Sequence, residues 1–387
     1  MKCRAAVMRG VGADWTIEDV TLDPPRDDEV LVMMKVAGVC HSDDHFTTGD
    51  YIPTPELAAI MQLAGAPVFD PFPVLGGHEG AGIVEEVGPG VRSVQPGDHV
   101  AMSFIPACGR CRFCVSGQTY LCDAGAMLMA KEMTTDGTTR RHVGSEDLTA
   151  MAQLGTFAEY AVLAEDSVVK VDDDLPLEAA SLVSCGVTTG WGSGTTGVGT
   201  QPGDTVVIVG TGGIGLNAVQ GARAAGANTV VAIDPVDFKR DSAKFFGATD
   251  TSPSMEEAFG LVQELTLGVM ADRVVLTPSV LRPELLISAL MLTRKGGTCL
   301  MTAVPKLEVS MVPLVLSDML QSCKTLKGLL YGGMNPRAST PMLLSMYRHG
   351  NLKLDELVTR RYSLDELNTA IVDMREGRNL RGIIEFA

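Results

Sequence analysis

The sequence has no excess of basic residues and no apolar stretch long enough to cross a bilayer. Its formal net charge is −16, which argues against nucleic acid as a partner because phosphate binding calls for a basic surface. Apolar runs such as residues 285–292 are far shorter than the roughly 20 residues that span a membrane. Residues 1–10 contain no apolar core of signal-peptide length. We therefore predict a cytoplasmic protein that binds neither membrane nor nucleic acid.

The nine cysteines are interpreted as metal ligands or buried thiols, because disulfides are rare in a reducing compartment. Four of them form a C-x2-C-x2-C-x7-C run, which can complete a tetrahedral shell around zinc and leave no open position. An iron–sulfur cluster is the alternative, but ferredoxin motifs place the fourth cysteine after three residues and before proline. We predict a structural zinc site formed by Cys108, Cys111, Cys114 and Cys122. The cysteines outside any ligand pattern are expected to be ordinary apolar residues: Cys3, Cys299 and Cys323.

Strand and helix signals divide the chain into parts. Residues 1–100 carry short β-rich segments such as 30–36 and 82–87, which predicts an antiparallel, barrel-like domain. A polar loop is expected over residues 134–147. From about residue 182 to about 330, apolar runs alternate with helical stretches, which predicts βαβ units and a parallel sheet. Two amphipathic helices and a strand over residues 382–386 complete the pattern.

A glycine-rich motif lies in the βαβ part, after the apolar run 206–209 and before a helical stretch. It fits G-x-G-x-x-G, in which the first glycine allows a tight turn, the second lets the backbone approach a pyrophosphate and the third lets helix and strand pack. Asp234 ends the next strand, where a carboxylate binds the adenosine ribose and repels a 2′-phosphate. The motif therefore predicts NAD rather than NADP, bound by Gly210, Gly212, Gly213, Ile214 and Gly215.

Five motifs occur in an order that resembles the zinc-containing medium-chain alcohol dehydrogenases. They are Gly-Val-Cys-His-Ser-Asp-Asp-His at 38–45, Gly-His-Glu-Gly-Ala-Gly at 77–82, the four-cysteine run, Ser-Cys-Gly at 184–186 and the glycine motif. The resemblance covers nearly the whole chain. It implies a GroES-like barrel catalytic domain built from residues 1–186 and 331–387, a Rossmann NAD-binding domain over 187–330, and an active site in the cleft between them.

The same resemblance implies a catalytic zinc held by Cys40, His78 and Cys185, with water or substrate in the fourth position. Glu79 would sit beside the metal as a transient ligand, and Asp43 would orient His78. Zinc would polarise the alcohol oxygen while hydride passes to the nicotinamide ring.

Further positions match the family's relay and cofactor contacts. Ser42 and His45 resemble the proton relay, in which histidine is the terminal acid or base because its side chain titrates near neutral pH. The resemblance implies that His41 and Arg381 bind the pyrophosphate and that Lys239 lies near the adenosine ribose. The backbone at Ala303 and Val304 would meet the nicotinamide amide.

The sequence also departs from the animal members of the family. Thirty-seven residues separate Cys40 from His78, and the excess falls in residues 51–74, where 56–63 could form a short helix. This insertion is expected to border the substrate channel, although a harmless surface insertion is the alternative. Residues 274–279 lack the family's Glu-x-x-Gly pattern. The insertion and the overall pattern most resemble the actinobacterial nitroso-dimethylaniline-dependent branch, in which NAD stays bound and an external acceptor regenerates it.

We therefore expect a zinc-dependent alcohol dehydrogenase with two zinc ions and NAD, active on a small-molecule alcohol or aldehyde, with an external electron acceptor as a further partner. A homodimer formed through the cofactor domains is expected first and a homotetramer second. Two other functions stay open. One is a glutathione- or mycothiol-dependent formaldehyde dehydrogenase on the same scaffold. The other is a non-catalytic NAD-binding sensor, which we would expect to have lost a zinc ligand or a relay residue.

Overall fold

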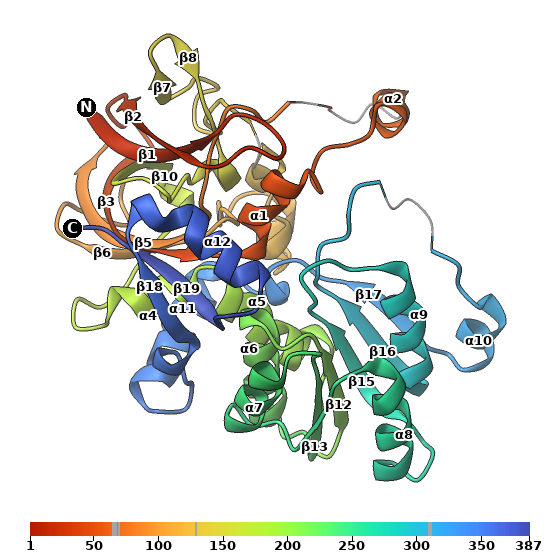
Figure 1. The fold of residues 1–387 in the computed structure, drawn as a ribbon. Coiled ribbons are helices and arrows are strands. Elements are labelled where there is room, and N and C mark those ends of the chain that lie inside the picture. Colours follow the sequence, from red (N-terminus) through yellow and green to blue (C-terminus); the bar gives the residue numbers. More distant parts are fainter. Residues whose placement is uncertain (64–67, 69, 128–129, 309–311) are drawn as a thin grey trace. The chain divides into compact units, whose positions relative to one another are not determined.

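The computed structural model describes residues 1–63, 68, 70–127, 130–308 and 312–387. The chain forms two compact units (Figure 1). Unit 1 comprises Met1–Cys185 and Asn335–Ala387, and unit 2 comprises Gly186–Met334. Within the described ranges, no helix has both the length and the apolar character needed to cross a membrane.

Unit 1 is built on two sheets. The first has the strand order β8-β7-β2-β1-β4-β9. Its strands are β1 (Lys2–Met8), β2 (Thr16–Leu22), β4 (Val74–Leu75), β7 (Arg141–Val143), β8 (Glu146–Asp147) and β9 (Thr149–Ala150). The second has the order β11-β6-β5-β3-β19-β18, with β10 also paired to β3. Its strands are β3 (Glu29–Val39), β5 (Glu79–Val87), β6 (His99–Met102), β10 (Tyr160–Ala164), β11 (Val168–Lys170), β18 (Val358–Tyr362) and β19 (Arg381–Glu385).

Strand β3 organises the second sheet, since nearly all of its residues are buried and it pairs antiparallel with β5, β10 and β19. The register sets Gly38 opposite Glu79 on β5 and opposite Ile383 on β19. Two segments more than 300 residues apart in sequence therefore flank the end of β3, immediately before Cys40. A buried strand of this kind needs apolar residues on both faces, which the run Glu-Val-Leu-Val-Met-Met-Lys-Val-Ala-Gly-Val largely supplies.

Short helices join and cover these strands. The α-helices are α1 (His41–Thr48), α2 (Pro55–Leu63), α3 (Arg112–Val115), α4 (Leu177–Val183), α11 (Pro336–Arg348) and α12 (Leu367–Arg375). The 3-10 turns are η1 (Thr119–Leu121), η2 (Asp123–Met127), η3 (Met151–Gln153), η4 (Glu165–Ser167), η7 (Asp355–Leu357) and η8 (Leu364–Glu366).

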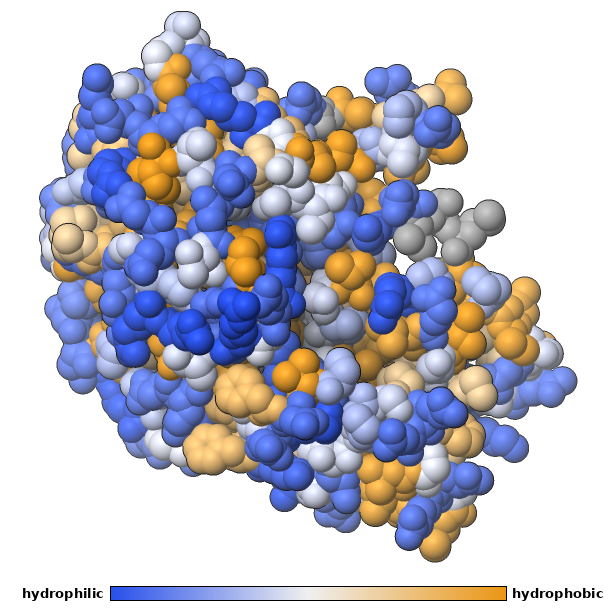
Figure 2. Space-filling model, in the orientation of Figure 1, coloured by the Kyte–Doolittle hydropathy of each residue, from blue (hydrophilic) through white to orange (hydrophobic). Residues whose placement is uncertain are grey.

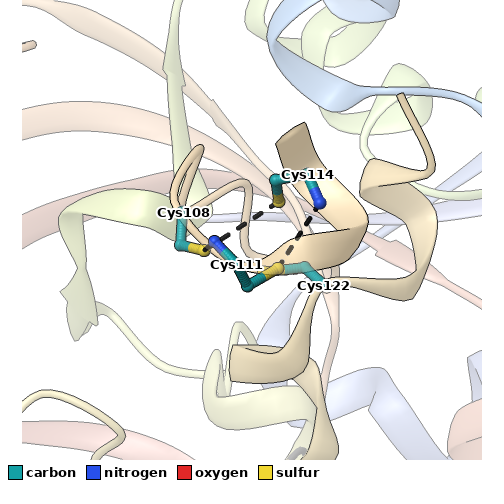
Figure 3. Close-up of side chains that lie close together, drawn as sticks. All are labelled: Cys108, Cys111, Cys114 and Cys122. Carbon is teal, nitrogen blue, oxygen red and sulfur yellow. Dashed lines mark hydrogen bonds between the residues drawn. The ribbon is translucent and has the colours of Figure 1, made fainter. Parts of the chain in front are cut away.

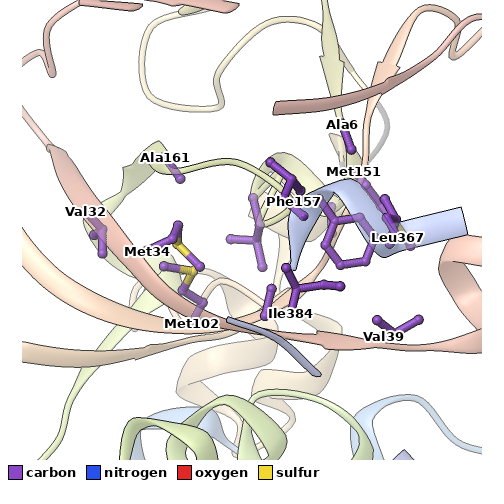
Figure 4. Close-up of a cluster of buried hydrophobic side chains, with 14 of the residues drawn as sticks. Ala6, Val32, Met34, Val39, Met102, Met151, Phe157, Ala161, Leu367 and Ile384 are labelled. Carbon is purple, nitrogen blue, oxygen red and sulfur yellow. The ribbon is translucent and has the colours of Figure 1, made fainter. Parts of the chain in front are cut away.

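The main core of unit 1 brings together strands and the C-terminal helix (Figure 4). Met34 of β3, Met102 of β6, Ile384 of β19 and Leu367 of α12 are all buried in it. Polarisable methionines fill irregular space between sheet and helix. Because the core includes Ile384 and Leu367, residues far along the chain help to fix the strand that leads to Cys40.

Unit 2 contains a parallel sheet with the order β14-β13-β12-β15-β16-β17. Its strands are β12 (Thr205–Val209), β13 (Thr229–Ile233), β14 (Asp250–Ser252), β15 (Ala271–Leu276), β16 (Thr293–Met301) and β17 (Thr325–Gly328). Its helices are α5 (Gly186–Gly192), the π-turn η5 (Ser193–Gly197), α6 (Gly213–Ala224), α7 (Asp237–Phe245), α8 (Met255–Leu265), α9 (Pro283–Leu292), α10 (Leu316–Gln321) and the turn η6 (Tyr331–Gly333). This order is that of the doubly wound dinucleotide-binding fold, so the βαβ prediction is confirmed.

One sequence expectation held only in part, since residues 134–140 form a loop but strands begin at Arg141, and another was wrong. The polar loop over residues 134–147 ends in the hairpin β7–β8 and contains two fully buried arginines, Arg140 and Arg141. Arg140 is buried because it donates two hydrogen bonds to the carboxylate of Glu29, at 2.7 and 2.8 Å, an ion pair that the sequence separation conceals. Cys323 is exposed rather than apolar core, whereas Cys3 and Cys299 are buried.

Candidate active site

Helix α1 starts at the end of β3 and presents the first ligand candidate. Cys40 is its N-cap residue, with extended backbone angles, and its N–H donates to Asp43 Oδ2 at 3.0 Å in a capping box. An acidic residue at this position also suits the positive end of the helix dipole. The first turn of α1 therefore fixes both Cys40 and Asp43.

The fully buried Asp43 ties this turn to the loop before β5. Its Oδ1 atom accepts hydrogen bonds from Gly77 N and from His78 Nδ1, each at 3.2 Å. The contact directs Nδ1 of His78 toward Asp43 and leaves Nε2 for another partner. Among the residues that the structure describes, this buried Nε2 has no hydrogen-bond partner.

Cys40, His78, Glu79 and Cys185 come together in one buried cluster, with one ligand atom from each within 4.8 Å of the others. Cys185 follows α4, and the adjoining Ser184 Oγ accepts from Gly80 N at 3.2 Å, which ties the last ligand to β5. A hydrogen bond with the Cys185 thiol holds the pKa of Cys40 well below its usual value although burial opposes the shift. The cluster thus contains a thiol that readily becomes a thiolate, the form that binds metals.

Glu79 is ion-paired with Arg381. Arg381, which the sequence predicts to bind pyrophosphate, therefore lies beside the cluster of candidate metal ligands in unit 1. Arg381 Nη2 donates to Glu79 Oε2, and the two side chains are 6% and 0% exposed. Burial raises the pKa of Glu79 to about 7, against the opposing charge of Arg381. A Cβ atom at Gly38 would lie 2.3 Å from Glu79 Oε2, so the glycine makes room for the pair. Glu79 Oε1 and Arg381 Nε have no hydrogen-bond partner within the described part of the chain.

The predicted relay residues lie on α1. Ser42 Oγ is 3.9 Å from Cys40 Sγ, and the buried His45 lies in the last turn. Two neighbours escaped the sequence analysis. Asp50 Oδ2 lies 2.8 Å from His45 Nδ1. Tyr51 packs edge-on against the His45 ring at 5.1 Å between centroids. Burial raises the pKa of Tyr51, against a hydrogen bond with Ser42 that lowers it.

A signal for Asp50 exists in the sequence. Gly49 directly follows α1, and glycine after the last residue of a helix usually adopts a left-handed conformation that reverses the chain. The residue after such a glycine returns toward the helix end. His41 is the first residue of α1 and is partly exposed.

The four remaining predicted ligands form a second cluster (Figure 3). The sulfurs of Cys108 and Cys114 are 3.9 Å apart, and all four sulfurs lie within 4.8 Å of one another. Backbone N–H groups of Cys111 and Cys114 donate to Cys108 Sγ and Cys111 Sγ, both at 3.4 Å. Hydrogen bonds from the backbone of Asp123, and then of Cys114, to the Cys111 sulfur lower the pKa of Cys111 to about 6. The sulfurs therefore converge on one point, as a four-thiolate site requires.

The glycine motif forms the turn between β12 and α6 in unit 2. Gly210 has φ +88°, which an L-residue rarely adopts, and a Cβ at Gly215 would lie 1.9 Å from Gly210 O. Around Gly212, by contrast, an added Cβ would meet no heavy atom of the described residues within 4 Å. The turn is therefore tightly packed at Gly215, whereas described atoms leave space beside Gly212. Gly213 and Ile214 begin α6, so their N–H groups belong to its free N-terminus.

Side chains from neighbouring strands hold this turn. Asp234 Oδ2 accepts from Thr211 N at 2.9 Å, and the carboxylate is buried. Thr277, which stands in the stretch lacking Glu-x-x-Gly, donates to Gly210 O at 2.6 Å. Thr277 therefore ties β15 to the glycine turn, a role that the sequence did not reveal.

The other predicted cofactor contacts have these positions. Lys239 lies partly exposed on α7, the helix that follows Asp234. Ala303 N donates to Leu276 O at 3.1 Å, and Val304 O accepts from Leu281 N at 3.0 Å. The first contact extends the end of β16 beside β15, and the second joins Val304 to the segment that precedes α9.

The insertion forms helix α2, as predicted, with its first residue at Pro55. None of its residues is buried, and Ile60 and Leu63 are 61% and 89% exposed. Figure 2 shows hydrophobic residues at the place of α2 in Figure 1. Residues 64–67 and 69 of the insertion, including Pro67, lie outside the described residues.

Comparisons with known proteins agree with this arrangement. Residues 26–173 match the family described as Alcohol dehydrogenase GroES-like domain, and residues 213–347 match Zinc-binding dehydrogenase. The chain is 47% identical to the NDMA-dependent alcohol dehydrogenase of Amycolatopsis methanolica over 384 residues, which is 99% of both chains. It is 45% identical to alcohol dehydrogenase B of Mycobacterium tuberculosis over 386 residues, which is 100% of this chain and 99% of that one.

Solved structures give the same result. The benzyl alcohol dehydrogenase of Acinetobacter calcoaceticus superposes with a TM-score of 0.87 at 28% identity, with 100% of both chains covered. An alcohol dehydrogenase zinc-binding domain protein from Burkholderia ambifaria gives a TM-score of 0.88 at 30% identity over 100% of this chain and 99% of that one. The predicted GroES-like and Rossmann fold is therefore confirmed, and the chain belongs to the zinc-containing alcohol dehydrogenase family.

Proposed function

We propose that this enzyme oxidises an alcohol to an aldehyde or ketone, or catalyses the reverse reaction, by hydride transfer involving NAD. Unit 1 is the catalytic domain and unit 2 the NAD-binding domain. The observation that carries the proposal is the buried cluster of Cys40, His78 and Cys185, in which Nε2 of His78 has no hydrogen-bond partner among the described residues. A buried polar atom without a partner is costly, so this nitrogen is best explained as a metal ligand.

The donor set suits zinc. Two thiolates and one imidazole match its borderline softness and leave a fourth position for substrate. When bound, zinc supplies a Lewis acid that lowers the pKa of the alcohol hydroxyl, and NAD supplies the hydride acceptor. The second cluster offers four thiolates and no open position, so we assign it a structural zinc. The proposal is thus two zinc ions per chain.

The chain's own residues then orient groups and move the proton. Asp43 holds the His78 ring through Nδ1, which keeps Nε2 directed at the cluster. Ser42 Oγ lies 3.9 Å from Cys40 Sγ, close enough to the cluster to accept a proton from a hydroxyl bound there. His45 is the terminal acceptor of that proton. Arg381 balances the charge of the buried Glu79.

The glycine turn suits a dinucleotide. The open space above Gly212 leaves room for a pyrophosphate, and the α6 N-terminus supplies N–H donors and the positive end of a helix dipole. Asp234 places a carboxylate at the end of β13, which favours NAD over NADP. The name of the Amycolatopsis relative supports an external acceptor for this enzyme as well, with NAD retained between turnovers.

We also propose a homodimer formed through unit 2. Strand β17 lies at the edge of the parallel sheet and pairs with β16 alone among the described strands. Three of its four residues are exposed. An unpaired edge strand is a ready site for pairing with a second copy. Light scattering after size exclusion will show a dimer, or a tetramer if a second interface exists.

The test is a substrate screen of primary and secondary alcohols and hydroxymethyl-thiol adducts. Each is run with added NAD and, separately, with nitroso-dimethylaniline and no added NAD. Bound nicotinamide and zinc are measured on the same preparation. The proposal predicts turnover of simple alcohols, which Cys40→Ser abolishes while one zinc remains. Turnover confined to hydroxymethyl-thiol adducts would favour the formaldehyde dehydrogenase alternative, and failure with every substrate would favour the sensor.

A further inference from the structure

The turn that follows α1 places an acidic side chain against the histidine of the relay. Helix α1 ends at Thr48, and Gly49 adopts the left-handed conformation with φ 76° and ψ 12°. Its N–H donates to Phe46 O at 3.3 Å. A Cβ at Gly49 would also lie 2.9 Å from Val11 Cγ1. Glycine therefore reverses the chain here and returns the next residue, Asp50, to the last turn of the helix.

Asp50 and His45 form a buried, directed contact. Oδ2 of Asp50 lies 2.8 Å from His45 Nδ1, and each side chain is 4% exposed. Thr48 Oγ1 donates to the same oxygen at 2.7 Å. An ionised carboxylate can only accept hydrogen bonds, so the proton of the contact belongs to Nδ1 of the histidine. The tautomer of His45 is thereby set, with Nε2 as the proton-accepting atom.

Asp50 is the carboxylate that lies against His45 and can balance its positive charge. The other acids of α1 are committed elsewhere: Asp43 accepts from Cys40 N, Gly77 N and His78, and Asp44 is ion-paired with Arg375 of α12. Tyr51 contributes an aromatic edge to the ring. The carbonyl end of α1 adds a weaker attraction for a cation in its last turn.

We propose that Asp50 is a positioning residue of the proton relay, which fixes the His45 tautomer and neutralises the imidazolium that forms during alcohol oxidation. This inference rests on the proposed function. The O–H bond of the alcohol breaks, its proton passes by way of Ser42, and an N–H bond forms at His45 Nε2. The hydride leaves the carbinol carbon for the nicotinamide cofactor. The positive charge gained by His45 is balanced within the protein by Asp50.

The test compares Asp50→Asn with Asp44→Asn in the holoenzyme, using kcat–pH profiles for alcohol oxidation. Asp44→Asn removes a buried carboxylate from the same helix without touching His45. We expect Asp50→Asn to lower kcat about tenfold or more and to move the acid limb of the profile about one pH unit downward. KM stays within about twofold, because the substrate does not contact Asp50. Asp44→Asn leaves the limb in place.

A double-mutant comparison identifies the route of the effect. In a His45→Gln background, Asp50→Asn costs no further activity if it acts only through His45. Asp50→Glu, which keeps the charge, restores part of the loss. If Asp50→Asn does not fold, Thr48→Val replaces it in the experiment. The Asp50 carboxylate then loses the hydrogen bond from Thr48 and becomes a stronger acceptor for His45. The acid limb of the kcat–pH profile therefore moves to higher pH.

The outcomes separate two failures. An unmoved limb, or an equal loss in the His45→Gln background, overturns the role of Asp50 while wild-type alcohol oxidation still supports the proposed function. A wild-type protein that oxidises no alcohol refutes both.

Discussion

A matched pair of alanine substitutions tests the dinucleotide site most sharply. Gly212 and Gly215 stand three residues apart in one motif, yet the structure assigns them different tasks. Gly212 has φ −74° and ψ −165°, which alanine can adopt, and its added methyl would meet no atom in the part of the chain that the structure describes. In Gly215→Ala the methyl would lie 1.9 Å from Gly210 O and 2.9 Å from Thr277 Oγ1. Gly212→Ala is therefore expected to hinder ligand binding, and Gly215→Ala is expected to destabilise the folded protein.

The magnitudes follow from these contacts. Gly212→Ala costs at most about 1 kcal/mol of stability, the loss from alanine at a helix N-cap. It weakens NAD binding about 10- to 100-fold, or about 1.4 to 2.8 kcal/mol, because the methyl occupies the pyrophosphate position. Gly215→Ala costs about 1–3 kcal/mol of stability through overpacking.

Two measurements decide the matter: thermal unfolding of the apoprotein, and NADH titration by fluorescence or the nicotinamide released per chain. Gly212→Ala should unfold near the wild-type temperature with weakened binding, and Gly215→Ala should unfold earlier. Wild-type NAD affinity in Gly212→Ala would refute a pyrophosphate above that residue. Wild-type stability in Gly215→Ala would refute the close contact of turn and helix.

Four further changes have defined outcomes. Asp43→Asn should weaken zinc at the Cys40 cluster about 10- to 100-fold, because a carboxylate that orients a ligand is lost; elemental analysis should show zinc falling from two toward one per chain. Arg140→Met should cost about 3–5 kcal/mol in denaturant unfolding by leaving the buried carboxylate of Glu29 without its charged partner, and adding Glu29→Gln should recover part of that loss. Burial raises the pKa of Asp136, but hydrogen bonds from Arg140 and other donors outweigh it and hold that pKa well below its usual value. The stabilising contribution of Asp136 is therefore complete above the unfolded-state pKa of about 4 and is lost as pH falls through the folded-state pKa. Asp136→Asn should thus flatten the acid limb of a stability–pH curve. Shortening residues 51–74 should change KM across a panel of alcohols while zinc content stays constant, and unchanged kinetics would mean that the insertion is only a surface feature.

The sequence was sufficient for features that depend on local pattern. The alternation of apolar and helical stretches predicted the parallel sheet of unit 2, and the spacing of Cys108, Cys111, Cys114 and Cys122 predicted their convergence. The glycine motif carried its own structural reasons, since Gly210 needs a positive φ and Gly215 needs a missing side chain. Each of these constraints acts within a few residues, so it is written in adjacent positions.

Features that depend on distant pairing were not predictable in this way. Cys40, His78 and Cys185 were joined only by resemblance to a family, because the register of β3 with β5 and the position of α4 decide their proximity. The pairs Glu29–Arg140 and Glu79–Arg381 span 111 and 302 residues. Thr277 was missed because its role depends on β15 lying beside β12. Asp50 was missed for a different reason, since the glycine before it was not taken as a helix end.

The position of β19 between β3 and β18 has a consequence for biosynthesis. The ribosome makes this strand after the whole of unit 2, although it pairs with residues immediately before Cys40. Domains generally fold as units, the earlier ones first, during synthesis. Unit 2 is therefore the first part able to reach its final form, and the sheet that carries Cys40 and Glu79 must wait for a strand synthesised some 340 residues after Cys40. Until then the strand that leads to Cys40 lacks one of its neighbours in the sheet, so metal binding by this cluster should be a late step in maturation.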